Sequence, residues 1–174
     1  MSPAADFRLL TFDPARVETS GKFLGGNVYW KLYFVENIFR VIINSVLLAQ
    51  IGPNWWLTAV DQKIRDRAQR FKLDYLARPW HTKPGSHDIY YIQLWDLNEI
   101  MRANSHLFLP IVSDVDSWIA RIEQLRLPRN IVSHMNFPDR IDRKRIDVFY
   151  SDCMSLLQQL QTTMSAKSWP LQIP

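Results

Sequence analysis

The segment from residue 28 to 50 constrains the fold most, because its apolar side chains recur at spacings of three and four residues. This spacing places them on one face of an α-helix. The residues of this stripe are Leu32, Val35, Phe39, Ile42, Val46 and Ala49. Gly25-Gly26-Asn27, which precedes the stripe, is typical of a loop that ends in a helix N-cap at Asn27. The sequence therefore predicts a long helix with a core-facing stripe and, beside it, a polar line of Glu36, Arg40 and Asn44.

Residues 41–60 form the longest run without a charge, which is nearly the length of a membrane span. Gly52-Pro53 divides this run, and Asn44, Gln50 and Asn54 interrupt it. We interpret the run as the end of a buried helix and expect no membrane segment.

Further segments of helical length follow, separated by loops that contain proline or glycine. Helices are predicted at 55–71, at 89–103, at 111–127 with a continuation or restart at 128–134, and at 142–163, with a loop at 78–87 and a break at Phe137-Pro138. No segment alternates strictly between apolar and polar residues, as a half-buried strand would. The predicted fold class is all-α, an antiparallel bundle of about five to six helices. We expect an N-terminal extension at 1–26, the helical domain at 27–165 and a C-terminal tail at 166–174.

Length and composition fit one folded domain, since the chain has 174 residues and 47% of them are hydrophobic. A formal charge of +4 and a pI near 9.3 make RNA an acceptable partner without demanding it. The single Cys153 cannot form an intramolecular disulfide, no Cys/His cluster has zinc spacing, and the N-terminus does not resemble a secretory signal. We expect a cytoplasmic protein without a metal or other cofactor.

The helix predicted at 111–134 carries a stripe that changes character along its length. The stripe follows spacings of three and four through Val112, Val115, Ile119, Ile122, Arg126, Arg129 and Ser133. Up to Ile122 it is apolar, as a core requires. Beyond Ile122 the helix presents Arg126, Arg129, Asn130, Ser133 and His134. Two interpretations are open: this face emerges into solvent, or it lines a polar groove or a polar subunit interface.

Arginine and histidine together suit chemistry on phosphodiesters, because guanidinium binds phosphate oxygens bidentately and imidazole transfers protons near neutral pH. In RNA the 2′-hydroxyl is an internal nucleophile, so a proton acceptor and a cation can suffice without a metal. Asn130 and His134 are four residues apart and share a helix face, so Asn130 can orient the imidazole. Arg129 reaches the same phosphate from the edge of the stripe, through a kink at Pro128, or if a second copy completes the site. The spacing alone decides nothing, because such an Arg and His pair arises by chance on the order of once in a chain of this composition.

Residues 125–134, Leu-Arg-Leu-Pro-Arg-Asn-Ile-Val-Ser-His, resemble the Leu-Arg-x-x-Arg-Asn-x-x-x-His signature of the HEPN superfamily. Residues 29–40, Tyr-Trp-Lys-Leu-Tyr-Phe-Val-Glu-Asn-Ile-Phe-Arg, and the following Gly-Pro-Asn-Trp-Trp at 52–56 are similar to the start of HEPN domains in RNA-surveillance endonucleases and their bacterial relatives. Residues 89–100 and 102–108 also resemble that branch. The resemblance covers most of residues 28–160, and only its Arg-Asn-x-x-x-His element is specific.

The resemblance implies a helical bundle that forms a homodimer, with Arg129 and His134 of both copies facing one RNA strand. His134 would act in proton transfer and Asn130 would orient it, with Arg126 and Ser133 as supporting residues. Glu36 would reach the groove from the first long helix, as in some relatives, although a solvated position on that helix is equally open. The implied activity is metal-independent RNA cleavage in RNA processing, as a toxin or in phage defence, with an antitoxin or a larger complex as a further partner.

Two residues depart from the patterns of the family. Pro128, immediately before Arg129, removes a helix hydrogen bond and leaves the geometry of the motif open. Asn136 stands where HEPN toxins regulated by nucleotide modification carry a tyrosine, so that regulation is not expected. Since some HEPN domains have lost catalysis, a non-catalytic dimerisation or RNA-binding module is the alternative to a ribonuclease.

The remaining polar residues receive no role from the sequence. The most basic stretch contains Lys63, Arg65, Arg67, Arg70 and Lys72, and such a run is usually a solvated helix face. His81, His87 and His106 are expected at the surface without a metal, and Cys153 is expected to be a small core residue.

Overall fold

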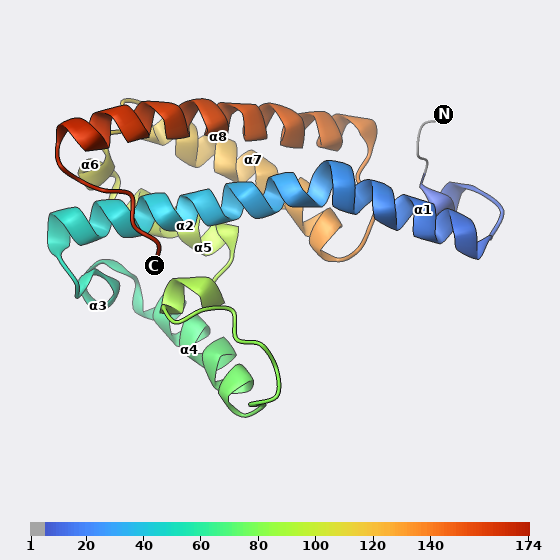
Figure 1. Cartoon of the computed structure of the whole chain (residues 1–174), viewed down its shortest axis with the longest axis horizontal. Helices are drawn as coiled ribbons and strands as arrows, with labels where there is room; N and C mark the ends of the chain where they lie inside the picture. Colours follow the sequence, from blue (N-terminus) through green and yellow to red (C-terminus); the bar gives the residue numbers. More distant parts are fainter. Residues whose placement is uncertain (1–5) are drawn as a thin grey trace.

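The computed structural model describes residues 6–174, which form helices and loops and, within that range, no strand (Figure 1). The elements in chain order are η1 (Phe7–Leu9), α1 (Pro14–Leu24), η2 (Gly25–Tyr29), α2 (Trp30–Ile51), α3 (Trp55–Ala59), α4 (Gln62–Leu76), η3 (Asp88–Tyr91), α5 (Leu94–Ala103), α6 (Ser105–Phe108), α7 (Val115–Ser133) and α8 (Arg140–Ala166). Helix α2 packs against α5 and α8, and α7 packs against the same two helices. The predicted all-α class is confirmed, and the architecture is a helical bundle.

The first long helix begins earlier than the sequence indicated. Asp13 caps α1, because its carboxylate accepts a hydrogen bond from the backbone N–H of Ala15 at 2.9 Å, and Pro14 occupies the first turn. Helix α1 then continues through a π-helical turn at η2 into α2. The predicted loop and N-cap at residues 25–27 are therefore wrong. Asn27 does not cap a helix, since its amide donates to the carbonyl of Phe23 one turn back.

The core lies along α2, whose predicted stripe is buried at Leu32, Val35, Phe39, Ile42 and Val46, whereas Ala49 is exposed at the helix end. Phe39 is fully buried and lies against the rings of Trp118 from α7 and Phe149 from α8, with centroid separations of 6.2 and 6.3 Å. Aromatic side chains bury a large apolar area, so contacts between them dominate the energetics of a core. The contact therefore fixes α7 and α8 against the middle of α2.

Aspartate caps set several helix boundaries away from those predicted. The Asp61 carboxylate accepts from the Lys63 N–H at 2.8 Å, which divides the predicted helix at 55–71 into α3 and α4. Asp114 caps α7, which begins at Val115 and continues through Pro128, and Asp139 caps α8. The segment predicted as one helix at 89–103 is divided between the 3-10 turn η3 and helix α5. The loop at 78–87 is confirmed.

The helix that runs from Pro14 to Ile51 is long and apolar enough to cross a membrane, with a mean hydropathy of 1.5 over its most apolar window. Of that window, 56% is buried inside the structure. Core packing therefore accounts for most of these apolar side chains.

The C-terminal residues are attached to the middle of α2, which the chain end crosses in Figure 1. The Asn44 amide donates to the Gln172 carbonyl at 3.1 Å, and the Ser45 hydroxyl accepts from the Gln172 N–H at 2.8 Å. The Asn44 side-chain oxygen accepts from the indole N–H of buried Trp55 at 3.2 Å. Residues after α8 thus complete the core.

Candidate functional site

A polar cleft of about 490 Å³ lies between the first turns of α2 and the last turns of α7. Helix α2 contributes Tyr33, Glu36 and Arg40 to its lining, and α7 contributes Arg129 and Ser133. Pro84 and Tyr90, which follow α4, line a further side of the cleft. Residues from three distant parts of the sequence therefore meet here.

Glu36 is placed between two arginines inside this cleft. Its Oε1 accepts from Arg40 Nη2 at 2.6 Å, and its Oε2 accepts from Arg129 Nη2 at 3.2 Å and from Arg129 Nε at 3.4 Å. The first contact is an i,i+4 pair within α2, whereas the second joins α2 to α7. One carboxylate between two guanidinium groups leaves the cluster with a net charge of +1, which favours an anion in the cleft.

Arg40 is committed to holding the fold. Its guanidinium donates to the carbonyls of Ile89 at 3.3 Å and Ile92 at 3.0 Å and to the Asn37 side chain at 3.1 Å, in addition to Glu36. These bonds tie the segment around η3 to α2. With its side chain 11% exposed, Arg40 has little donor capacity left for a ligand.

Arg129 is held more loosely than Arg40. Its three hydrogen bonds, two to Glu36 and one of 3.4 Å from Nη1 to the Gln93 amide oxygen, are all longer than 3.1 Å. A guanidinium has five N–H donors, so two remain without a partner from residues 6–174. Because its side chain is 19% exposed and lines the cleft, Arg129 can bind an anion there.

His134 lies at the rim of the cleft, between Ser133 and Met135, which both line it. Helix α7 ends at this point, because Met135 adopts a left-handed conformation with φ 58° and the Asn136 N–H donates to the Ile131 carbonyl at 2.9 Å. The His134 side chain is exposed, and no residue in 6–174 hydrogen-bonds its imidazole. A methionine in this conformation is strained by about 1–2 kcal/mol, and strain of this kind is often found beside functional residues.

Asn130 and Arg126 are directed to another side of α7. They line, with Gln93 and Trp95, a hollow of about 20 Å³ between α7 and α5, and the Arg126 guanidinium lies 5.3 Å from the Trp95 ring centroid. The Asn130 amide does not hydrogen-bond His134. The two residues are joined through the backbone of the last turn, since the His134 N–H donates to the Asn130 carbonyl at 3.0 Å, but not through their side chains.

Both interpretations of the polar stripe on α7 apply to part of it. Leu125, Pro128 and Val132 carry the buried face onward, so the core contact turns by about one position after Ile122. Arg126 is exposed to solvent, and Arg129 and Ser133 line the cleft. The Ser133 hydroxyl donates to the Arg129 carbonyl at 2.7 Å.

No pattern in the sequence pointed to the cleft residues Pro84 and Tyr90, or to Gln93, whose amide oxygen accepts a hydrogen bond from Arg129. The sequence also left Arg40 without a role, although the i,i+4 spacing from Glu36 is readable. Among residues 6–174 no group of three or more His, Cys, Asp or Glu side chains could hold a metal ion. Comparison of the chain with known families, with curated proteins and with solved structures found no match.

Proposed function

We propose that this chain is a metal-independent endoribonuclease of the HEPN type that acts as a homodimer. The observation that carries the proposal is the cleft, in which Glu36 holds Arg129 and on whose rim His134 presents a free imidazole. These are the arginine and the histidine of the motif that resembles the HEPN signature. Arg129 and Glu36 are 93 residues apart in the chain, so their contact is a property of the fold.

The proposed reaction uses the 2′-hydroxyl of RNA. An imidazole takes the 2′-hydroxyl proton, O2′ attacks the adjacent phosphorus, and the bond from phosphorus to O5′ breaks while O5′ receives a proton. The products are a 2′,3′-cyclic phosphate and a 5′-hydroxyl. Arg129 binds the phosphate oxygens and stabilises the charge that develops on them, and Glu36 positions Arg129.

A second copy of the chain completes this site. In one copy the side chain of His134 does not line the cleft, so two His134 imidazoles from a two-fold pair are the proton acceptor and donor of the proposal. Exposed Tyr29, Tyr33 and Met135 surround the cleft, and Met135 is 83% exposed. Large apolar side chains of this kind are enriched in subunit interfaces.

One observation favours the alternative of a non-catalytic HEPN-like dimerisation or RNA-binding module. No group within residues 6–174 orients the His134 imidazole, and a proton-transfer histidine normally has its tautomer fixed by a hydrogen bond. Such a module would keep Arg129 for binding and would not cleave RNA.

The test is incubation of the purified protein with end-labelled RNA in EDTA. His134→Ala is expected to lower cleavage by about a hundredfold or more with the fold and dimer intact. Arg129→Ala should lower both cleavage and RNA binding. Matched controls are His106→Ala and Arg102→Ala, because both side chains are exposed and lie on α6 and α5, outside the cleft.

Three results would overturn the nuclease: no cleavage by the wild-type protein, cleavage that requires added magnesium, or full activity of His134→Ala. Retained, Arg129-dependent RNA binding without cleavage would support the module instead.

A further inference from the structure

The most basic part of the chain is a projecting arm, which we define as α4 with the loop at 77–87. Its residues, 62–87, contain seven Lys or Arg and two Asp, a formal charge of +5, whereas the whole chain carries +4. In Figure 1, α4 and this loop project away from the long helices. The arm therefore carries the positive field of the molecule on one protrusion.

The outer half of the arm exposes rings as well as charges. The buried residues of α4 are Ile64 and Ala68, both in its inner half. Beyond them Phe71, Tyr75 and Trp80 are exposed, Trp80 by 75%. Phe71 and Tyr75, with Asp74, Arg78 and His81, line a hollow of about 280 Å³. The usual interpretation of a basic run, an ordinary solvated helix face, does not account for two exposed rings on α4 and a third, Trp80, on the loop after it.

The cations near these rings have few carboxylate partners. In the inner half of α4 Arg67 pairs with Asp96, and in the outer half Lys72 pairs with Asp88. Toward the tip, Arg70 and Lys83 form no ion pair within residues 6–174, and the Arg78 contact with Asp74 is exposed and 4.0 Å long. Free cations next to exposed rings are the combination that binds single-stranded nucleic acid, because bases stack on the rings and phosphates meet the cations.

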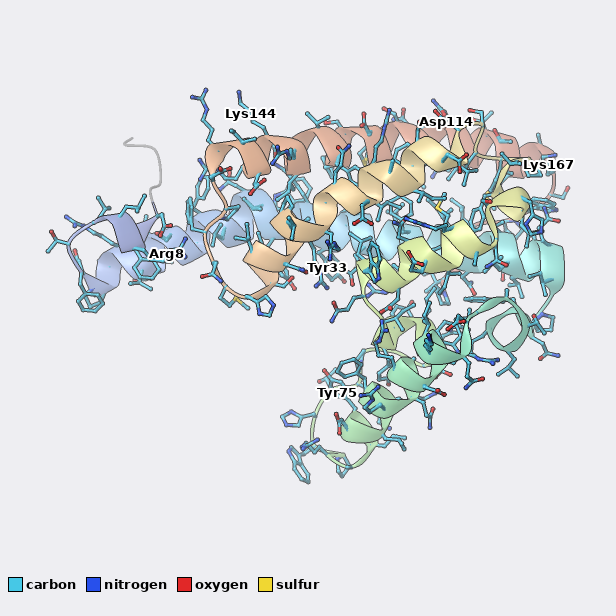
Figure 2. The ribbon with its side chains drawn as sticks, turned by 180° about the vertical axis from the view of Figure 1, so that it is seen from behind. Arg8, Tyr33, Tyr75, Asp114, Lys144 and Lys167 are labelled. Carbon is cyan, nitrogen blue, oxygen red and sulfur yellow. The ribbon has the colours of Figure 1, made fainter. Side chains whose placement is uncertain are left out.

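The arm also leads into the cleft. Pro84, from its loop, and Tyr90, which follows it, line the cleft that holds Arg129, and the Arg40 guanidinium lies 5.9 Å from the Tyr90 ring centroid. Trp80 is four residues before Pro84, so at most about 14 Å of chain separates them. Figure 2 shows Tyr75 on the arm and Tyr33 at the edge of α2 toward the arm. A strand bound in the cleft can therefore continue along the arm.

We propose that the arm binds the single-stranded RNA that flanks the cleaved bond, with bases stacked on Trp80 and Tyr75 and phosphates held by Arg70 and Lys83. This inference rests on the proposed function, since it takes RNA as the ligand of the cleft. A duplex is disfavoured, because its paired bases are not available for stacking on side chains.

The test measures fluorescence anisotropy with the intact wild-type protein and a labelled, fully 2′-O-methylated single-stranded RNA of about 20 nucleotides, which cannot react through its 2′ position. Trp80→Ala should weaken binding by about fivefold or more, because it removes a stacking platform. Phe12→Ala is the matched control, an exposed ring on the loop before α1. Unfolding temperature is measured alongside, and Trp80→Ala should leave it unchanged because the ring is exposed.

Salt dependence separates stacking from charge. Lys83→Ala should reduce the slope of log Kd against log salt by about 0.7, the value for one phosphate contact of a single strand, whereas Trp80→Ala should leave the slope unchanged. Lys144→Ala is the matched control, because Lys144 is exposed on α8, which Figure 2 shows on the opposite side of the bundle from the arm.

Wild-type affinity in both arm variants would overturn the inference, as would equal, Trp80-dependent binding of duplex RNA. A Trp80→Ala variant that lost binding only to phosphatidylserine vesicles would overturn it in favour of a membrane surface. Arm-dependent RNA binding by a protein that cleaves no RNA would support the arm and contradict the nuclease. Cleavage that depends on His134 but not on the arm would support the nuclease and contradict the inference about the arm.

Discussion

Arg40 and Arg129 both bind Glu36, yet their surroundings give them different tasks, and replacing each by methionine separates these tasks. Methionine keeps an apolar stem of similar length and removes every donor. In Arg40→Met the carbonyls of Ile89 and Ile92, two buried residues, lose their guanidinium partner, and Glu36 loses its shorter ion pair. A buried acceptor without a partner costs about 1–3 kcal/mol, so Arg40→Met should destabilise the protein by about 3–5 kcal/mol.

Arg129→Met should cost much less. Its contacts to Glu36 are 3.2 and 3.4 Å long, water in the cleft can replace them, and Glu36 keeps Arg40 at 2.6 Å. A partly exposed ion pair of this kind contributes about 0–1 kcal/mol. RNA binding and cleavage should nevertheless be lost in Arg129→Met, because the free donors of the cleft belong to Arg129.

Urea unfolding followed by the fluorescence of the 7 Trp residues measures the difference. With a slope of about 2 kcal/mol/M, Arg40→Met should lower the midpoint by about 1.5–2.5 M and Arg129→Met by less than about 0.5 M. Equal midpoint losses in the two variants would refute the division into a structural and a ligand-binding arginine.

Two further predictions concern stability away from the cleft. Asn44→Ala should destabilise the protein by about 1–3 kcal/mol and speed tryptic cleavage after Lys167, because buried Trp55 loses its acceptor and the chain end loses a contact with α2; unchanged urea and trypsin profiles would contradict this. His87 stacks on Trp55, its Nδ1 accepts from the Ile89 N–H, and burial lowers the pKa of its imidazole below 6.5, with Lys72 adding to the lowering and Asp88 opposing it. The neutral form of His87 therefore contributes stability that is present above pH 6.5 and is lost as the pH falls through the lowered pKa. The urea midpoint should fall more steeply between pH 7.5 and 5.5 in the wild-type protein than in His87→Asn.

The helical class and the buried face of α2 could be predicted because a three-and-four spacing over many residues has one stable outcome, burial of that face. The polar line beside it could not be interpreted in the same way. Arg40 and Asn44 are buried, and their partners at Ile92 and Gln172 are 52 and 128 residues away. The spacing of apolar residues shows which face of one helix is buried, but it does not identify the distant segments that pack against that helix.

The predicted helix boundaries were wrong where they depended on a local signal alone and not on the packing around it. Glycines at 25 and 26 usually interrupt a helix, yet here they lie in a π-helical turn between α1 and α2. Conversely, an aspartate side chain accepts a hydrogen bond at the start of each of four helices: Asp13, Asp61, Asp114 and Asp139. The residue type and the helical segment that follows it predict all four caps. His87 was expected at the surface, but it is half-buried. Its imidazole stacks on Trp55 of α3, a contact between distant residues that no local signal predicts.

The end of α7 connects the cleft to the N-terminal part of the chain. Met135 turns the chain back, and Arg8 then donates to the Asn136 side-chain oxygen at 3.1 Å and to the Phe137 carbonyl at 3.4 Å. Arg8 also holds Asp6, which lowers the pKa of that carboxyl through their hydrogen bond. Tyr29, Val132 and Met135 line the polar cleft on one side and an apolar groove of about 470 Å³ on the other.

The Arg8 contacts hold the chain that follows His134, at Asn136 and Phe137. On a straight helix, residues 129 and 134 would be separated by roughly 140°, and only a different backbone path changes that angle. His134 still lies on that helical path, because its N–H donates to the Asn130 carbonyl at 3.0 Å and the left-handed Met135 redirects the chain only after it. One copy of α7 therefore does not place Arg129 and His134 on the same face, and a phosphate bound at Arg129 would need the imidazole of a second copy, as in the proposed homodimer.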